Sequence, residues 1–231
     1  MNLETLKKEA ALQALEHVKS GMLLGLGTGS TARHFIDALG QALRNNELTN
    51  IRAVATSAAS EVQAEGYGIE LLELRGQSLD LAVDGMDEVD ADLNAVKGLG
   101  GALTREKIVE ACAREFILIG DETKTVSYLG ETSPIPVEVV QFGWRATLEK
   151  LSALGVHPER REPDGEPFVT DNGNFILDCD VEKEMDVARL AEQFSGTPGV
   201  VEHGLFLNMA TLAYVATERG VTELKKPGGQ V

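Results

Sequence analysis

Cysteine is scarce in this sequence, and the two that occur, Cys112 and Cys179, are far apart and lack the spacing of a metal site. This pattern excludes a disulfide scaffold and predicts two free thiols in a reducing compartment. Long apolar runs are also missing, because none approaches the ~18 residues that cross a bilayer. The polar stretch from Met1 to Glu9 has no apolar segment of a secretory signal. We therefore expect a cytoplasmic protein.

Basic residues are few as well. The chain has 21 Lys and Arg against 37 Asp and Glu, a formal net charge of −16. No run of Lys and Arg would form a basic patch, so nucleic acid and a membrane surface are disfavoured as partners. A small anionic metabolite stays possible if its site is locally positive. A lysine beside a glycine loop is therefore a strong candidate.

The composition is that of a folded protein, with 43% hydrophobic and 25% charged residues, and 231 residues suffice for one or two domains. In the first half, apolar runs alternate with segments of helical periodicity. Helices are predicted over 2–19, 30–43, 57–65 and 104–114, and strands over 22–26, 51–55, 79–83 and 116–119. This alternation predicts an α/β fold with a parallel sheet wrapped by helices.

The pattern changes after Gly130. A strand over 137–140, a helix over 143–154, a hairpin that pairs 168–170 with 175–177 across Asn172-Gly173, and a helix over 183–195 are predicted. This order suggests a small α+β domain. The apolar tail from Leu205 to Ala216 could return to the first domain. The expected division is 1–130 with 205–231 as one domain and 131–204 as the other.

The first segment that could bind a ligand is the glycine loop Gly25–Thr31, which lies between a predicted strand and a predicted helix. Its backbone N–H groups, the helix N-terminus and the hydroxyls of Ser30 and Thr31 together make an anion site. It does not match a dinucleotide fingerprint, because Ser30 stands where the third glycine belongs. It is not a Walker loop either, because no lysine follows Gly29. A tight turn capped by Ser30 is the alternative.

An acidic segment, Asp84–Asp92, follows the strand over 79–83 and holds five acids in nine residues. Ligands bind at the carboxyl ends of strands in open α/β sheets, so Asp84 is expected to face inward. A metal site is the alternative, but the spacing does not fit an EF-hand loop and no histidine is near. Asp90 and Asp92 fit a solvated acidic loop.

A basic, glycine-rich segment, Lys97–Lys107, leads into a predicted helix. Glu106 would lie in the first turn of that helix, where a carboxylate can also act merely as a complement to the helix dipole. Lys124 follows the strand end Gly120-Asp121, and a lone lysine there is usually only solvated. The four histidines are scattered, and no serine or cysteine triad can be assembled.

In this order the segments closely resemble ribose-5-phosphate isomerase of the A type. The family patterns G-x-G-T-G-S-T, D-G-A-D-E and K-G-G-G-A-A-L-T-R-E-K stand here as Gly25–Thr31, Asp84–Glu88 and Lys97–Lys107, with weaker echoes at Pro136–Val139 and Val169–Asn174. The resemblance spans nearly the whole chain. Met86 replaces the usual alanine and Leu99 a usual glycine, and a leucine would resist a positive φ.

The resemblance implies interconversion of D-ribose 5-phosphate and D-ribulose 5-phosphate through an enediolate, in the non-oxidative pentose phosphate pathway, without metal or cofactor. It also implies a Rossmann-like catalytic domain, a smaller α+β, ferredoxin-like lid and a homodimer. Glu106 would be the base between C2 and C1, Asp84 and Asp87 would open the ring and move hydroxyl protons, and Lys97 would stabilise the enediolate. The substrate-binding residues would be Thr28, Gly29, Ser30, Thr31, Asp84, Gly85, Met86, Asp87, Lys97, Gly98, Leu99, Gly100 and Lys124.

The pKa of Glu106 is subject to two opposing effects. A helix N-terminus lowers the pKa of a carboxyl group, whereas burial under a lid raises it. Two rival functions also remain. A coenzyme A transferase, with a similar fold and glutamate, would need a nucleotide-sized pocket and form a thioester. A sugar-phosphate sensor of a transcription regulator would need a DNA-binding module ahead of Gly25, where only 24 residues stand.

Overall fold

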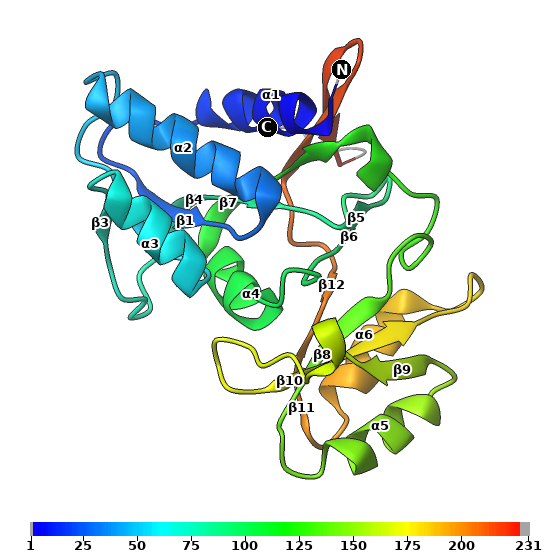
Figure 1. Cartoon of the computed structure of the whole chain (residues 1–231). Helices are drawn as coiled ribbons and strands as arrows, with labels where there is room; N and C mark the ends of the chain where they lie inside the picture. Colours follow the sequence, from blue (N-terminus) through cyan, green and yellow to red (C-terminus); the bar gives the residue numbers. More distant parts are fainter. Residues whose placement is uncertain (1, 227–231) are drawn as a thin grey trace.

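The computed structural model of the chain describes residues 2–226. It shows two bodies, a larger one around a seven-stranded sheet and a smaller one around a four-stranded sheet (Figure 1). Residues 1 and 227–231, which belong to the first of the two predicted domains, lie outside the described residues. No helix within 2–226 has the length and apolarity that a membrane crossing requires.

The larger sheet is parallel apart from one edge strand. In spatial order its strands are β14 (Gly220–Lys225), β13 (Leu212–Thr217), β7 (Ala113–Asp121), β4 (Leu79–Gly85), β1 (Leu23–Leu26), β2 (Arg52–Ala55) and β3 (Glu70–Leu71). Only β13 and β14 pair antiparallel. The order reverses between β1 and β4, as in Rossmann-like sheets. The predicted return of the apolar tail is confirmed, because β13 pairs with β7.

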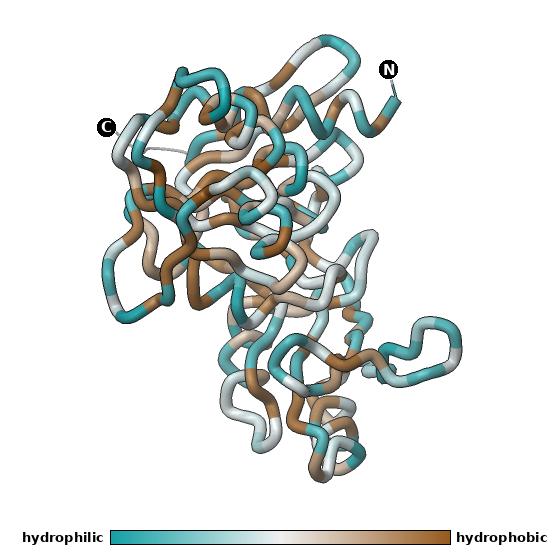
Figure 2. The backbone as a smooth tube through the Cα atoms, turned by 60° about the vertical axis from the view of Figure 1, so that its left-hand side comes forward, coloured by the Kyte–Doolittle hydropathy of each residue, from teal (hydrophilic) through white to brown (hydrophobic). Residues whose placement is uncertain are grey.

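Both faces of this sheet are covered, as predicted. The helices α1 (Leu3–Leu15), α2 (Ser30–Arg44) and α3 (Ala58–Gly66) pack on one face, and α4 (Leu103–Ala111) packs on the other. Alternation along β7 shows the division, since Ile117 and Ile119 face α1 and α2 while Phe116 and Leu118 face away from them. In Figure 2 hydrophobic (brown) stretches of the backbone run through the middle of the larger body. The second face also carries a small sheet that the sequence did not predict, formed by β5 (Glu88–Val89), β6 (Ala95–Val96) and β12 (Leu205–Phe206).

The smaller body is the predicted α+β unit. Its antiparallel sheet has the order β11 (Val200–His203), β8 (Ile135–Val139), β10 (Phe175–Asp180) and β9 (His157–Arg160), and one face is covered by α5 (Trp144–Ser152) and α6 (Val187–Ser195). Its core is continuous with the larger body, because Val96, Val126 and Leu205 belong to the same hydrophobic cluster. The two bodies are therefore joined by packing as well as by the chain.

The predicted hairpin between 168–170 and 175–177 is wrong in its first strand. β10 pairs with β9, and 168–170 follows the short 3₁₀ helix η2 (Pro163–Gly165) as irregular backbone. The turn itself is present: Thr170 N donates to Asn174 O at 2.9 Å, and Gly173 has φ 79°. The Asn-Gly sequence specifies the turn, but 168–170 does not form a strand before it. The Thr170 side chain bonds to buried Glu138. The helix predicted over 183–195 begins later, at Val187, where Asp186 caps it.

The smaller body should depend on Phe194, which is fully buried on α6, and not on Phe142, whose exposed fraction is 94%. We expect Phe194→Ala to lower the free energy of unfolding by about 3–5 kcal/mol, because it leaves a cavity in a packed core. Phe142→Ala should change it by less than about 0.5 kcal/mol. Urea unfolding followed by circular dichroism measures both, and equal losses would contradict this view of the core.

Candidate active site

The glycine loop and Asp84 meet where the strand order of the larger sheet reverses. β1 leads into the loop, and its neighbour β4 carries Asp84 near its carboxyl end. Thr28 N and Gly85 N donate to Asp84 Oδ1 at 2.9 and 2.6 Å. Gly27 allows this approach, since a Cβ at that position would lie 2.1 Å from Asp84 Cγ. This is the position at which open α/β sheets bind ligands.

Lys97 lies buried at the centre of a group of carboxyl groups. Its Nζ atom is 2.9 Å from Asp84 Oδ2 and 3.5 Å from both Glu106 Oε2 and Glu110 Oε1. It also donates to Gly85 O at 2.7 Å. Burial opposes the charged form of Lys97, but the carboxyl groups of Asp84, Glu106 and Glu110 outweigh this effect and raise its pKa. Lys97 is therefore a fixed positive charge.

At Glu106 the effect of burial on the pKa prevails over that of the helix N-terminus. Its side chain is almost completely buried in the first turn of α4. Burial raises the pKa of Glu106 to about 8, although the Lys97 ammonium acts in the opposite direction. A carboxyl group with this pKa is suited to accept and return a proton near neutral pH.

Glu110 is a third buried carboxyl group that the sequence analysis did not select. It lies one turn after Glu106 on α4, and neither of its side-chain oxygens has a hydrogen-bond partner among the described residues. Burial raises the pKa of Glu110 well above its usual value, and neighbouring Asp84 adds to the shift. The spacing of four residues from Glu106 was the available signal, because it places both side chains on one helix face.

Asp87 is held by the loop in which the sequence departs from the family pattern. Its Oδ2 accepts a hydrogen bond from Leu99 N at 2.8 Å, and burial raises its pKa. In this loop the residues with positive φ are Gly98, at 106°, and Gly101, at 84°. Leu99 does not have a positive φ. Met86, the other departure, fits against Gly120, where a Cβ would be 2.6 Å from Met86 Cε. Neither replacement strains the site.

The N-terminus of α2 is uncapped and lines the cavity that also contains Lys97. Gly29 is the N-cap residue, with φ 106°, and no side chain caps the helix. The alternative in which Ser30 caps a tight turn is therefore not observed. Lys124, on the 3₁₀ helix η1 (Glu122–Lys124), and Lys7, on α1, line the same cavity. Lys7 was missed, because nothing in the sequence connects the first helix to the glycine loop.

Most of the predicted binding residues share one cavity of about 120 Å³. It is lined by Lys7, Thr28, Gly29, Ser30, Thr31, Gly85, Met86, Asp87, Lys97, Gly98, Gly100, Glu106 and Lys124. Asp84 and Leu99 are the two predicted residues outside this lining. Asp84 is fully buried, and Leu99 N donates to Asp87. Three lysines thus line the cavity, together with two acids, Asp87 and Glu106. Lys7 also pairs with Glu4 at 2.8 Å.

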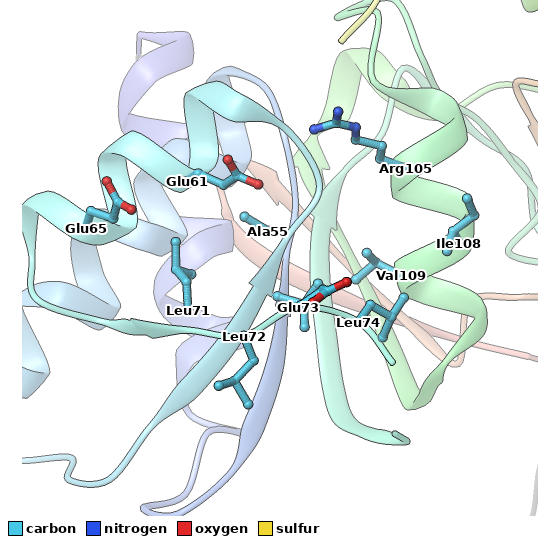
Figure 3. A pocket seen from close by; sticks show the side chains of 11 residues that line it. Ala55, Glu61, Glu65, Leu71, Leu72, Glu73, Leu74, Arg105, Ile108 and Val109 are labelled. Carbon is cyan, nitrogen blue, oxygen red and sulfur yellow. The ribbon is translucent and has the colours of Figure 1, made fainter. Parts of the chain in front are cut away.

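A larger groove of about 540 Å³ lies between α3 and α4 (Figure 3). Its charged lining is mainly acidic, with Glu61, Glu65 and Glu73. Its one basic residue, Arg105, donates to Asn172 and Asp171. An anion would be repelled there, so the smaller cavity is the candidate active site. Within residues 2–226 no cluster of His, Cys, Asp and Glu could hold a metal ion.

The fold and the site together define an enzyme of the aldose–ketose isomerase class. Residues 52–220 match the family described as ribose 5-phosphate isomerase A (phosphoriboisomerase A). The chain belongs to this family. It is 48% identical to ribose-5-phosphate isomerase A of Deinococcus radiodurans, with 98% of this chain and all of the relative (100%) covered. It is 46% identical to the probable ribose-5-phosphate isomerase 2 of Arabidopsis thaliana, with 96% of this chain and 87% of the relative covered.

Solved structures agree with this assignment. A D-ribose-5-phosphate isomerase in complex with phospho-erythronic acid is 41% identical and superposes with a TM-score of 0.94, covering 97% of this chain and 100% of its own. Ribose 5-phosphate isomerase A of Methanocaldococcus jannaschii is 42% identical, with a TM-score of 0.92 and coverage of 96% and 99%. The Rossmann-like sheet with a smaller α+β body is thus the architecture of the family.

Gly27→Ala tests whether the close approach to Asp84 matters. The new Cβ would displace the Asp84 carboxylate from Lys97 and Thr28. We expect kcat/KM for ketose formation from ribose 5-phosphate to fall at least about tenfold, since small misplacements in a site are costly. Gly66→Ala is the matched control, because Gly66 has open space around it and no positive φ. Wild-type kinetics in Gly27→Ala would show that the approach is dispensable.

Proposed function

We propose that the chain interconverts D-ribose 5-phosphate and D-ribulose 5-phosphate through an enediolate, with Glu106 as the single base. The observation that carries this proposal is the contact of 3.5 Å between the Glu106 carboxyl group and the Lys97 ammonium at a cavity with an open helix N-terminus. A proton on a carbon next to a carbonyl group can be moved by one carboxylate if a fixed positive charge meets the developing oxyanion.

In the proposed reaction the Glu106 carboxylate removes the proton from C2 of the open-chain aldose. The electron pair of that C–H bond forms the C1–C2 double bond, and the C1 carbonyl becomes an oxyanion. Lys97 stabilises this oxyanion without reorganising, because Asp84 and Gly85 O already hold its ammonium group. The proton on Glu106 then goes to C1, while the proton of the C2 hydroxyl moves to the C1 oxygen and leaves a ketone.

The contacts favour separate roles for the two aspartates. The family resemblance assigns ring opening and hydroxyl proton transfer to both. Asp84 already bonds to Thr28 N, Gly85 N and Lys97 and does not line the cavity. We therefore assign Asp84 to holding Lys97 and the glycine loop. Asp87 lines the cavity, and its raised pKa suits a group that exchanges protons with the sugar hydroxyls.

The phosphate group is proposed to bind at the N-terminus of α2. The Gly29–Thr31 segment supplies unpaired N–H groups and two hydroxyls, and Lys7 and Lys124 supply charge-assisted hydrogen bonds. The match to the ribose 5-phosphate isomerase A family counts against the coenzyme A transferase alternative. We also propose that 131–204 covers the substrate as a lid, that the protein is a homodimer, and that it is cytoplasmic, in keeping with its free cysteines.

Glu106→Gln separates catalysis from binding. The change keeps the size of the side chain and removes the base, so we expect kcat to fall by at least ~10²-fold. Affinity for a stable pentose-phosphate analogue should change little, because the phosphate contacts lie elsewhere. Steady-state kinetics, analogue titration and a thermal melt measure the three quantities. Turnover within a few-fold of wild type would move the base to another residue, Asp87 being the next candidate.

The pH dependence follows from the raised pKa of Glu106, about 8. Only the ionised carboxylate can act as base, so kcat/KM should rise about tenfold per pH unit below that value and level off above it. Initial rates between pH 6.5 and 9.5 test this, a range that lies above the second phosphate pKa near 6. A flat profile across this range would mean that Glu106 is already ionised at neutral pH.

A further inference from the structure

Glu138 is a buried carboxylate that no step of the proposed reaction uses. It lies on β8 with an exposed fraction of 0%. Its neighbours Val137 and Val139 fill the core of the smaller body, so the alternation of the strand directs Glu138 to the opposite face of the sheet. α4 packs near this face, and it carries the proposed base.

Four neutral donors surround the Glu138 carboxylate. Oε2 accepts from Thr104 Oγ1 at 2.5 Å. Oε1 accepts from Thr170 Oγ1 at 2.9 Å and from the amide nitrogens of Asn174 and Asn172 at 2.8 and 3.2 Å. One oxygen thus bonds to α4 and the other to the turn 170–174, which follows the segment predicted as the first hairpin strand. In Figure 1 this turn belongs to the yellow loop beneath α4.

The first turn of α4 depends on such outside contacts. Its N-cap residue is Ala102, which has no side chain able to cap the helix. Thr104 bonds to Glu138 instead, and Arg105 donates to Asn172 Oδ1 at 2.9 Å and to Asp171 O at 3.0 Å. The next residue is Glu106. Helix ends leave unpaired backbone groups and are the first part of a helix to open, so these bonds set the position of the turn.

We propose that Glu138 is a positioning residue, which acts through Thr104 to hold the first turn of α4 so that the Glu106 carboxylate faces Lys97 and the substrate. The inference rests on the proposed role of Glu106. It gives the Thr170–Asn174 segment a function: this turn completes the hydrogen-bond shell of Glu138 and ties the smaller body to the base. A proton transfer between carbon atoms is sensitive to such positioning, because a shift of about 1 Å can cost ~10²-fold in rate.

Thr104→Val tests the contact without removing a buried charge. Valine has the shape of threonine but lacks the hydroxyl that bonds to Glu138. We expect kcat to fall by about 10- to 100-fold and KM to change by less than about threefold, because the phosphate subsite lies on α2 and the lysines. Thr104→Ser restores the hydroxyl and should recover most of the loss. A folded Thr104→Val variant with wild-type kcat, or with only KM changed, overturns the proposal.

Glu138 itself can be tested by comparing Glu138→Ala with Glu138→Gln. The alanine variant should lose at least as much kcat as Thr104→Val, or fail to fold. A glutamine amide can donate to Thr104 while its oxygen accepts from the turn, so it should regain part of the activity. Gln141→Ala is the matched control: it removes the bond from Gln141 Nε2 to Gly173 O, 2.8 Å, which holds the same turn without touching α4. Its kcat should be that of wild type, and a loss equal to that of Thr104→Val would overturn the proposal.

The double variant Glu106→Gln/Thr104→Val distinguishes failure of this inference from failure of the proposed function. If Thr104 acts through the base, its loss should cost nothing further once the base is gone. An undiminished loss in the Glu106→Gln background would overturn the positioning role alone. Wild-type turnover of Glu106→Gln would instead overturn the assignment of the base.

Discussion

The interaction on which this site depends is the burial of one ammonium group among three carboxyl groups. Lys97 lies within 3.5 Å of Asp84, Glu106 and Glu110, all of them buried. Buried carboxyl groups without a positive partner are strongly destabilising, and so is a lysine left alone there. The carboxyl end of β4, the loop after β6 and one face of α4 must therefore converge on one point. The geometry that satisfies these charges also brings the Glu106 carboxyl group within 3.5 Å of the Lys97 ammonium group.

Burial has a second consequence for the chemistry. Burial is the main cause of the raised pKa values of Glu106 and Glu110; the Lys97 ammonium opposes it, and the nearby Asp84 carboxyl group adds to it. Burial in this cluster thus outweighs the position of Glu106 at a helix N-terminus, which by itself would lower its pKa.

The two bodies are held together by buried carboxylates as well as by packing. Glu88 accepts hydrogen bonds from Gly130 N, Thr132 N and Ser133 N, where the chain passes from the larger body to β8. Glu138 does the same for α4 and the turn 170–174. Together with the shared hydrophobic cluster, these contacts hold the smaller body against the larger one and against α4, although no residue of 131–204 lines the cavity.

Local signals in the sequence determined the parallel sheet, the glycine loop, the inward Asp84 and the pairing of Lys97 with Glu106 in one segment. These features depend on periodicity, on turn chemistry and on charges close in the chain, so they can be read without a fold. Only the tertiary structure brought Lys7 to the site, paired Asp84 with Lys97 and turned 170–174 towards Glu138. It also decided that the pKa of Glu106 is raised and not lowered. The reason is physical: burial and contacts between distant segments arise from the packing of whole elements, and no local pattern encodes which side chains will meet.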